Sequence, residues 1–326
     1  MKMKGLLLCF LFFIMGHGLF VPCEASAAGY PDRLIQLIIP AAAGSQADIN
    51  GRLLAGEMEK VLGTKIVVMN KPGASNILGI SALVRSKKDG YTFAYPSANG
   101  LVYARVMNPE TISYDTEKDV EPLGIHVFFP NVIAVRADSP WKNFEELVDY
   151  AKKNPGKLRV ATVGEGTIDS FNIEIIQSLT GARFTKIPFE GGESVTTALL
   201  GGHVEVVADV FSKYVAHAKA GKVRILLITK KKADFPEIPT MPELHYKQDL
   251  ASVWMAAIAP AGIPEDVKRT LVEAVAKAAS NPDSKAKIEQ MGNVADYESP
   301  AELRRLMTED YDRALAIAKR IGLRKP

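Results

Sequence analysis

Short apolar runs rich in β-branched residues alternate with helical segments along most of this 326-residue chain. The run from Leu34 to Ile39 stops at Pro40, and small residues follow before a helical stripe begins. The same strand–loop–helix step recurs, with strands expected at residues 66–69, 92–95, 132–135, 159–163, 185–189, 204–207 and 224–229. Near-continuous apolar strands separated by helices are typical of a parallel sheet covered on both faces. The pattern predicts an α/β fold of mainly parallel sheets flanked by helices.

These steps fall into two groups, at residues 34–99 and 131–229. Residues 252–262 form one more expected strand, and helical runs complete the chain. In open sheets of this kind, ligands bind outside the carboxyl ends of the strands. Two such groups with these ends facing each other would form two lobes, with a cleft lined by the loops that follow the strands.

The first residues have the composition of a targeting segment. Lysines precede an apolar stretch from Leu6 to Val21, and the small residues 25–27 follow. This order predicts a secretory signal peptide over residues 1–27. A membrane anchor is the alternative because the apolar stretch is long, and Cys23 leaves a lipoprotein open although the preceding proline fits lipid attachment poorly.

Cysteine usage and charge limit the possible classes of protein. Both cysteines, Cys9 and Cys23, lie in the leader, so the mature chain forms no disulfide and depends on a sizeable core. The formal net charge is +3, and basic residues are spread along the chain apart from the cluster at 230–232. No aromatic residues interleave with that cluster, which argues against nucleic-acid binding.

The loops that follow the expected strands share one chemistry. They include AAAGSQAD, GASN, PSANG and GEGTIDS, so they are rich in Gly, Ser, Thr, Asn and Ala. Several lead into helices, whose first turns carry N–H groups without intrahelical partners and a positive partial charge. Because these loops have so little bulk, their amides can come close to a small anion.

Some polar residues in these loops also have purely structural explanations. Ser45 and Asp48 have the spacing of a capping box, so either can cap the first helix. Asn76 and Asn99 can be turn residues. Asp209, which follows a buried strand, can be a helix cap or a loop acid.

Signatures of catalysis are scarce. The sequence contains no G-x-S-x-G motif and no H-E-x-x-H motif. The segment GGHVEV offers His203 and Glu205 on one strand face, which are too few ligands for a structural zinc. We therefore predict no catalytic residue, metal or cofactor. Trp254 has two interpretations, packing in the core or stacking on a ligand.

A series of longer segments covers essentially the whole mature chain. In order, they are YPDRLIQLIIP, GRLLAGEMEKVLGTKIVVMNKPGASNILG, KKDGYTFAYPS, NPGKLRVATVGEGT, ALLGGHVEVVADVFS, AGKVRILLIT, PEIPTMPEL and APAGIPEDVKRTL. Because these segments occur in this order, the chain resembles the periplasmic solute receptors of tripartite tricarboxylate transporters, also called Bug receptors. The resemblance implies a periplasmic, two-lobed binding protein of the type II-like, venus-flytrap class. The first lobe would comprise residues 28–127 plus 253–326, and the second lobe residues 128–252.

The resemblance also implies which residues hold the ligand. Family members hold a small carboxylate largely through backbone N–H groups and bridging waters in the first loop. The corresponding positions here are Ala41, Ala42, Ala43, Gly44, Ser45 and Asp48 in the first loop, Asn76 in the second, Ser97 and Asn99 in the third, and Gly166, Thr167 and Asp209 in the other lobe.

The chain departs from the family pattern at positions that bear on the ligand. An aromatic residue is usual at the position of Ala41, a histidine near Ser170, and a lysine or arginine at Glu190. Glu190 and Asp169 would add negative charge near the mouth of the cleft, or else point to solvent. If they face the cleft, we expect a ligand with fewer negative charges than citrate, or one that carries an amine.

The leading functional hypothesis is a receptor, not an enzyme, that delivers a monocarboxylate, a dicarboxylate, an amino acid or an aromatic acid to membrane permease subunits. A sensor subunit of a signalling system would have the same fold and pocket. A periplasmic hydrolase is disfavoured because histidines are scarce beside the strand-end loops. We expect a monomer that uses no cofactor and binds no nucleic acid.

Overall fold

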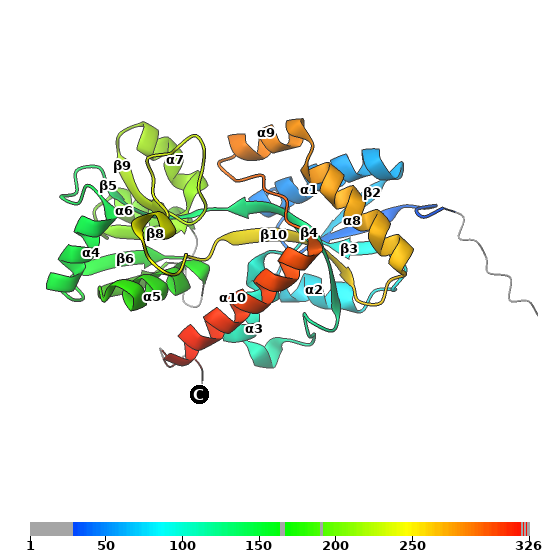
Figure 1. The fold of residues 1–326 in the computed structure, drawn as a ribbon, viewed down its shortest axis with the longest axis horizontal. Helices are drawn as coiled ribbons and strands as arrows, with labels where there is room; N and C mark the ends of the chain where they lie inside the picture. Colours follow the sequence, from blue (N-terminus) through cyan, green and yellow to red (C-terminus); the bar gives the residue numbers. More distant parts are fainter. Residues whose placement is uncertain (1–28, 164–166, 190–191, 321, 323, 325–326) are drawn as a thin grey trace, which may run out of the picture. The chain divides into compact units, whose positions relative to one another are not determined.

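Two sheets of five strands each organise the protein (Figure 1). The computed structural model describes residues 29–163, 167–189, 192–320, 322 and 324. Residues 31–326 form one compact unit. The predicted signal peptide lies outside the described residues, and the predicted bounds of the two lobes stay a prediction.

The first sheet has the strand order β2-β1-β3-β10-β4. Parallel pairing joins β1 to β2 and to β3, whereas β10 is antiparallel to both β3 and β4. Four strands therefore point the same way and β10 runs against them. The strands are β1 (Ile35–Ile39), β2 (Ile66–Asn70), β3 (Thr92–Ala94), β4 (Val120–Phe129) and β10 (Val253–Pro260).

The second sheet has the order β7-β6-β8-β5-β9. Its strand β6 is parallel to β7 and β8, and β5 runs antiparallel to β8 and β9. The predicted α/β class with mainly parallel sheets is therefore confirmed. The strands are β5 (Asn131–Arg136), β6 (Leu158–Thr162), β7 (Phe184–Pro188), β8 (Val206–Val210) and β9 (Val223–Ile228).

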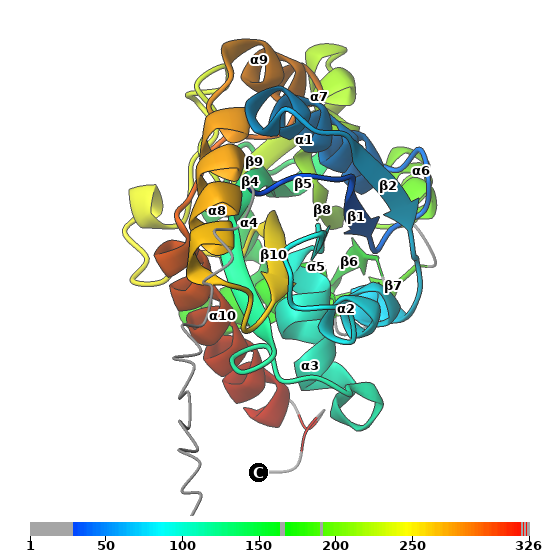
Figure 2. The ribbon, with the colours of Figure 1, turned by 90° about the vertical axis from the view of Figure 1, so that its right-hand side faces the viewer.

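Helices pack against these strands, and Figure 2 shows α1 and α2 on opposite sides of β1, which both contact. Among the described helices, none combines the length and apolar character that a membrane span requires. The helices are α1 (Gln46–Leu62), α2 (Ile77–Val84), α3 (Ala104–Met107), α4 (Phe144–Lys153), α5 (Ile168–Thr180), α6 (Gly192–Leu200), α7 (Phe211–Lys219), α8 (Glu265–Ala279), α9 (Pro282–Gln290) and α10 (Pro300–Arg320). Shorter turns are the 3₁₀ helices η1 (Ala74–Asn76), η3 (Pro109–Thr111) and η4 (Pro242–Leu244), and the π-helix η2 (Asn99–Tyr103).

Strand β4 was not predicted from the sequence. Pro122 and Gly124 interrupt its apolar pattern, and its pairing with β10 shifts register twice. Gly124 has a φ of +139°, and a Cβ there would lie 2.8 Å from the Tyr297 ring. The glycine therefore lets residues 294–298 lie along β4, where Ile125 bridges to Glu298. This contact stabilises a strand that local propensity does not favour.

The two sheets are connected at β4–β5 and again between β9 and β10. Only Pro130 separates β4 from β5. The Asn131 amide donates to Thr229 Oγ1 at 3.0 Å, and the Thr229 amide donates to the Asn131 carbonyl at 2.9 Å. Thr229 Oγ1 lies 2.7 Å from Ser252 Oγ. The two connecting segments are therefore hydrogen-bonded to each other.

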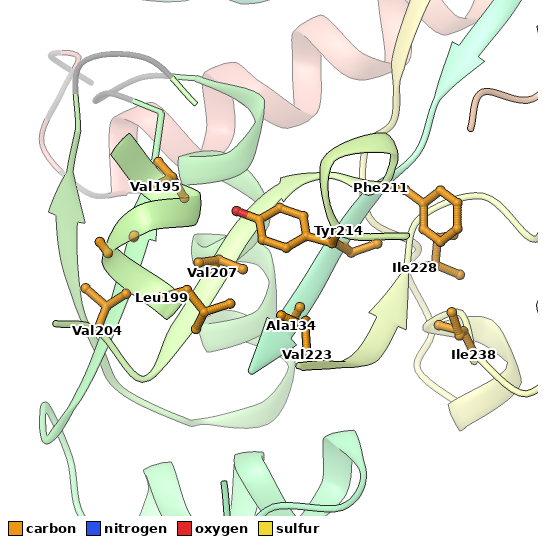
Figure 3. Close-up of a cluster of buried hydrophobic side chains, with 13 residues drawn as sticks. Ala134, Val195, Leu199, Val204, Val207, Phe211, Tyr214, Val223, Ile228 and Ile238 are labelled. Atoms are coloured by element: carbon orange, nitrogen blue, oxygen red, sulfur yellow. The ribbon is translucent and has the colours of Figure 1, made fainter. Parts of the chain in front are cut away.

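Figure 3 shows the core between the second sheet and its helices. Val207 on β8 and Leu199 on α6 pack there with Tyr214 and Phe211 on α7. These apolar groups are almost fully buried, and burying each stabilises the fold by about 1.5–3 kcal/mol. The core fixes β8 and α7, the elements that carry Asp209 and its partners.

Candidate functional site

The first loop connects β1 to α1 and exposes its backbone. Ala42, Ala43 and Gly44 are exposed, and Gly44 has a φ of +79° that favours glycine. Ser45 caps α1, because its Oγ accepts from the Asp48 amide at 3.3 Å. Within the described part of the chain, the amides of Ala42, Ala43, Gln46 and Ala47 have no acceptor. The loop therefore presents backbone donors at a helix start, where an anion is stabilised.

Asp48 holds this loop in place. Its carboxylate accepts from the Gly44 amide at 2.9 Å, from Asn70 Nδ2 at 2.8 Å, and from Arg52 Nε at 2.9 and 3.0 Å. Burial acts to raise the pKa of Asp48, but these hydrogen bonds outweigh burial and lower it. Asp48 is only 3 % exposed, and its oxygens are engaged by the protein. Asp48 therefore has a structural role at the start of α1, as its capping-box spacing with Ser45 indicated.

Asn76 connects three loops. Its Nδ2 donates to the Pro40 carbonyl of the first loop at 2.9 Å. Its Oδ1 accepts from the Ser97 amide at 2.9 Å and from Ser97 Oγ at 2.7 Å. Asn76 has a left-handed φ of +78°, which asparagine tolerates better than most residues. The side chain thus fixes the spacing of three strand-end loops.

The second and third loops approach each other closely. A Cβ at Gly100 would lie 2.6 Å from Asn76 Cβ and 3.0 Å from the Ser75 carbonyl oxygen. Only glycine fits this contact without displacing the loops. Asn99 begins η2, and its carbonyl accepts from the Ala104 amide across a π-helical turn. Single π-turns are frequent at functional sites.

A cavity of about 170 Å³ lies where these loops meet Thr167. This volume is about that of five or six molecules of liquid water, well below the roughly 300–1,000 Å³ of pockets for drug-sized ligands. None of the described lining residues carries a charge. They are Ser75, Asn99, Tyr103, Ala104, Met107, Asn108 and Thr167.

Thr167 is the last residue of the loop between β6 and α5. Its Oγ1 accepts from the Ser170 amide at 3.4 Å, so it caps α5. The neighbouring Phe171 ring lies 5.4 Å from the Tyr103 ring, centroid to centroid. The structure therefore brings Thr167 and Asn99 together at one cavity. Gly166 and Glu190 lie outside the described residues.

Asp209 lies within β8 and is 1 % exposed. Its carboxylate accepts from Lys213 Nζ at 3.1 and 3.2 Å and from the Tyr214 hydroxyl at 3.3 Å. Helix α7 begins after Val210 without a side-chain cap, so the interpretation of Asp209 as a helix cap is wrong. The buried carboxylate instead anchors α7 to the strand.

Asp169 is buried in the first turn of α5, with 6 % of its surface exposed, so the alternative that it points to solvent is wrong. Burial and then the charge of Asp209 raise the pKa of Asp169 to about 8. The carboxyl group is therefore mainly protonated at neutral pH. The predicted negative charge of Asp169 near the cleft mouth does not apply at that pH.

Sequence reasoning missed several residues that build the site. Asn70 and Arg52 hold Asp48, and Gln46 Nε2 donates to Ser212 Oγ at the start of α7, 3.2 Å away. Arg52 follows Asp48 at helical spacing and Asn70 ends a strand, so both were detectable. Ser75 and Tyr103 line the cavity because of loop and π-helix geometry, which leaves no pattern in the sequence.

Other candidate residues have structural roles. Trp254 is 1 % exposed and donates to Asp310 Oδ2 at 3.1 Å, so the interpretation as core packing is confirmed. Among the described residues, no group of three or more His, Cys, Asp or Glu side chains could hold a metal ion.

Together, the paired sheets and the strand-end loops define a two-lobed solute-binding protein, and comparisons with known proteins identify its family. Residues 51–323 match the family TctC, the tripartite tricarboxylate transporter family receptor. Protein BugT of Bordetella pertussis is 31 % identical over 264 residues, which cover 80 % of each chain. This chain therefore belongs to the TctC/Bug family of periplasmic solute-binding receptors, and the resemblance seen in the sequence is confirmed.

Solved structures agree with this assignment. A TctC solute-binding protein from Polaromonas superimposes with a TM-score of 0.81 at 26 % identity, covering 90 % of this chain and 100 % of that one. MatC from Rhodopseudomonas palustris, solved with bound malate, has a TM-score of 0.69 at 26 % identity, covering 88 % and 99 %. The two-lobed fold is thus shared along nearly the whole of those chains.

Proposed function

We propose that this receptor captures a small carboxylate between its lobes, with the ligand acid group on the amides of the first loop. The observation that carries this is the set of unpaired amides at Ala42, Ala43, Gln46 and Ala47, in a loop that Asp48 holds in place. Asn76 joins this loop to the two loops that line the uncharged cavity. Each charge-assisted hydrogen bond contributes about 1.5–3 kcal/mol. Two or three of them would support micromolar binding, near −8 kcal/mol.

Malate is the first ligand to test, because the structurally similar MatC was solved with bound malate. The predicted ligand residues extend from Ala41 to Asp48 and include Asn76, Ser97, Asn99, Gly166, Thr167 and Asp209. Asp48 and Asp209 would act by shaping the loop and the second sheet, since their oxygens already bond the protein. Bridging waters would complete the contacts.

The receptor would pass its ligand unchanged to the permease subunits of a tripartite transporter. Membership of the family supports this partner, and the leader expected at residues 1–27 supports export. Lobe closure around the ligand would present the surface that the permease recognises.

Thermal unfolding against a panel of acids tests the proposal. Receptor purified from the periplasm and stripped of ligand is heated with malate, succinate, glutamate, nicotinate, benzoate or citrate. A ligand at about 100 times its Kd stabilises the fold by about 2.7 kcal/mol, which is visible as a rise in Tm. We expect at least one small acid to raise Tm more than citrate does, and proton NMR to show that acid unchanged after incubation. No rise with any acid would contradict the proposal.

A charge placed in the first loop tests the location of the site. Ala43→Asp puts a carboxylate beside the exposed amides, so we expect Kd for the acid found in the panel to rise at least tenfold, about 1.4 kcal/mol. Ala43 is exposed, so Tm without ligand should change little. The matched control is Ala301→Asp, which makes the same change at an exposed position in the first turn of α10. Equal Kd for both variants would place the ligand elsewhere.

A further inference from the structure

Two buried carboxyl groups lie together at the ends of α5 and β8. Asp169 and Asp209 are 6 % and 1 % exposed, and the charge of Asp209 acts on Asp169. Two buried carboxyl groups whose charges act on each other do not both ionise readily, because each negative charge opposes the other. We therefore expect one of the two carboxyl groups to keep its proton, and the surrounding contacts decide which one.

The partners of the two groups differ. Asp209 bonds the Lys213 ammonium, and the Tyr214 hydroxyl donates to it from the core shown in Figure 3. Asp169 accepts from the Val163 amide and from Asn131 Nδ2, and among the described residues no cationic side chain hydrogen-bonds it. The nearby Lys186 instead pairs with Glu174 at 3.0 Å and donates to Ser170. The ionised member of the pair is therefore Asp209, and the proton belongs to Asp169.

Asn131 supplies an independent observation. Its side chain is 2 % exposed, its Nδ2 donates to Asp169, and its Oδ1 has no partner among the described residues. An ionised Asp169 offers no donor to this oxygen, whereas a protonated Asp169 carries an O–H that can be donated to it. An acid–amide pair would thus satisfy a buried acceptor whose desolvation otherwise costs about 1–3 kcal/mol.

We propose that Asp169 keeps its proton at neutral pH through an acid–amide pair with Asn131, and that this proton sets the charge which the second lobe offers to a bound anion. With Asp169 neutral and Asp209 balanced by Lys213, these three groups carry no net charge. Loss of the proton adds a negative charge at Asp169, two residues along the chain from Thr167, which lines the cavity. The effect on the anion rests on the proposed function, whereas the position of the proton does not.

The dependence of stability on pH follows from the direction of the shift. The pKa of Asp169 rises from 3.8 to about 8 on folding, so the folded state binds more protons between these values. This contribution to stability is fully present below the unfolded-state pKa of 3.8. It is lost as pH rises from there through the folded-state pKa of about 8. Asp169→Asn keeps the shape and the neutral state, so it removes this dependence.

Thermal unfolding without ligand tests the position of the proton. We expect the Tm of Asp169→Asn to exceed that of the native chain by an amount that grows by several degrees between pH 5 and pH 9, because only the native chain loses stability over this range. The control Asp138→Asn removes a carboxylate that is 69 % exposed and should follow the native pH profile. A lower Tm for Asp169→Asn near pH 9, or the same pH profile as the native chain, would overturn the proposal.

Calorimetric titration with malate tests the effect on the anion. Malate is a dianion between about pH 6.5 and 9, so we expect its Kd to rise about three- to tenfold over this range for the native chain and to stay constant for Asp169→Asn. A constant Kd for both proteins would overturn the charge-setting role. Absence of binding by malate and by every acid of the thermal panel, with the Tm difference present, would support the proton on Asp169 and count against the proposed function and the role built on it.

Discussion

Replacing Asn76 with alanine should lower the free energy of unfolding by about 3–5 kcal/mol and weaken acid binding more than tenfold. The change removes the hydrogen bonds to the Pro40 carbonyl, the Ser97 amide and Ser97 Oγ. Ser97 is buried, so its polar groups would be left without partners. Alanine also fits the φ of +78° poorly. Urea unfolding and calorimetric titration would measure the two effects.

Two further variants separate the causes. Asn76→Gly relieves the backbone but removes the same hydrogen bonds, so it should recover only about 1 kcal/mol of the loss. Asn154→Ala removes an asparagine that donates one exposed hydrogen bond, to the Tyr150 carbonyl, and should cost less than about 1 kcal/mol. If Asn76→Gly had native stability and affinity, backbone conformation alone would explain the role of Asn76.

Replacing Asp48 with asparagine should lower the free energy of unfolding by about 3 kcal/mol near neutral pH. The amide cannot accept from Gly44, Asn70 and Arg52 together as the carboxylate does. The pKa of Asp48 is lowered on folding, so its contribution is present above the unfolded value of 3.8 and is lost as pH falls through the folded value. Urea unfolding near pH 7 and near pH 3 would measure this difference.

Asp138→Asn is the matched control here as well. Its carboxylate pairs with Arg136 at the surface, so the change should cost less than about 1 kcal/mol at either pH. The Asp48 variant should also bind acids more weakly, because the first loop loses the contact that fixes the Gly44 amide. A variant of Asp48 that was as stable as the native chain near neutral pH would show that the loop is held by other contacts.

Much of the fold could be predicted because it depends on neighbours in the sequence. The apolar runs that become β1, β6 and β9 alternate with amphipathic helices, and this order alone indicates an α/β class. Strand β4 escaped prediction because Pro122 and Gly124 break its pattern, and contacts with β10 and residues 294–298 stabilise it. Local propensity carries no information about such partners.

The candidate site, like the fold, could be predicted from the sequence only in part. The small-residue loops around Gly44 and Asn76 were detectable, since little bulk beside a helix start is a local property. The side-chain partners were not, because Asn76 meets Pro40 and Ser97 only after the strands have taken their order in the sheet.

The sequence by itself determined the order of strands and helices, the cap at Ser45 and the small-residue character of the strand-end loops, since these depend on residues a few positions apart. Only the tertiary structure decided that Asp169 is buried against Asn131 and Asp209, and so whether it carries a charge. Ionisation depends on solvent exclusion and on charges brought close by folding, and neither can be read from positions along a chain.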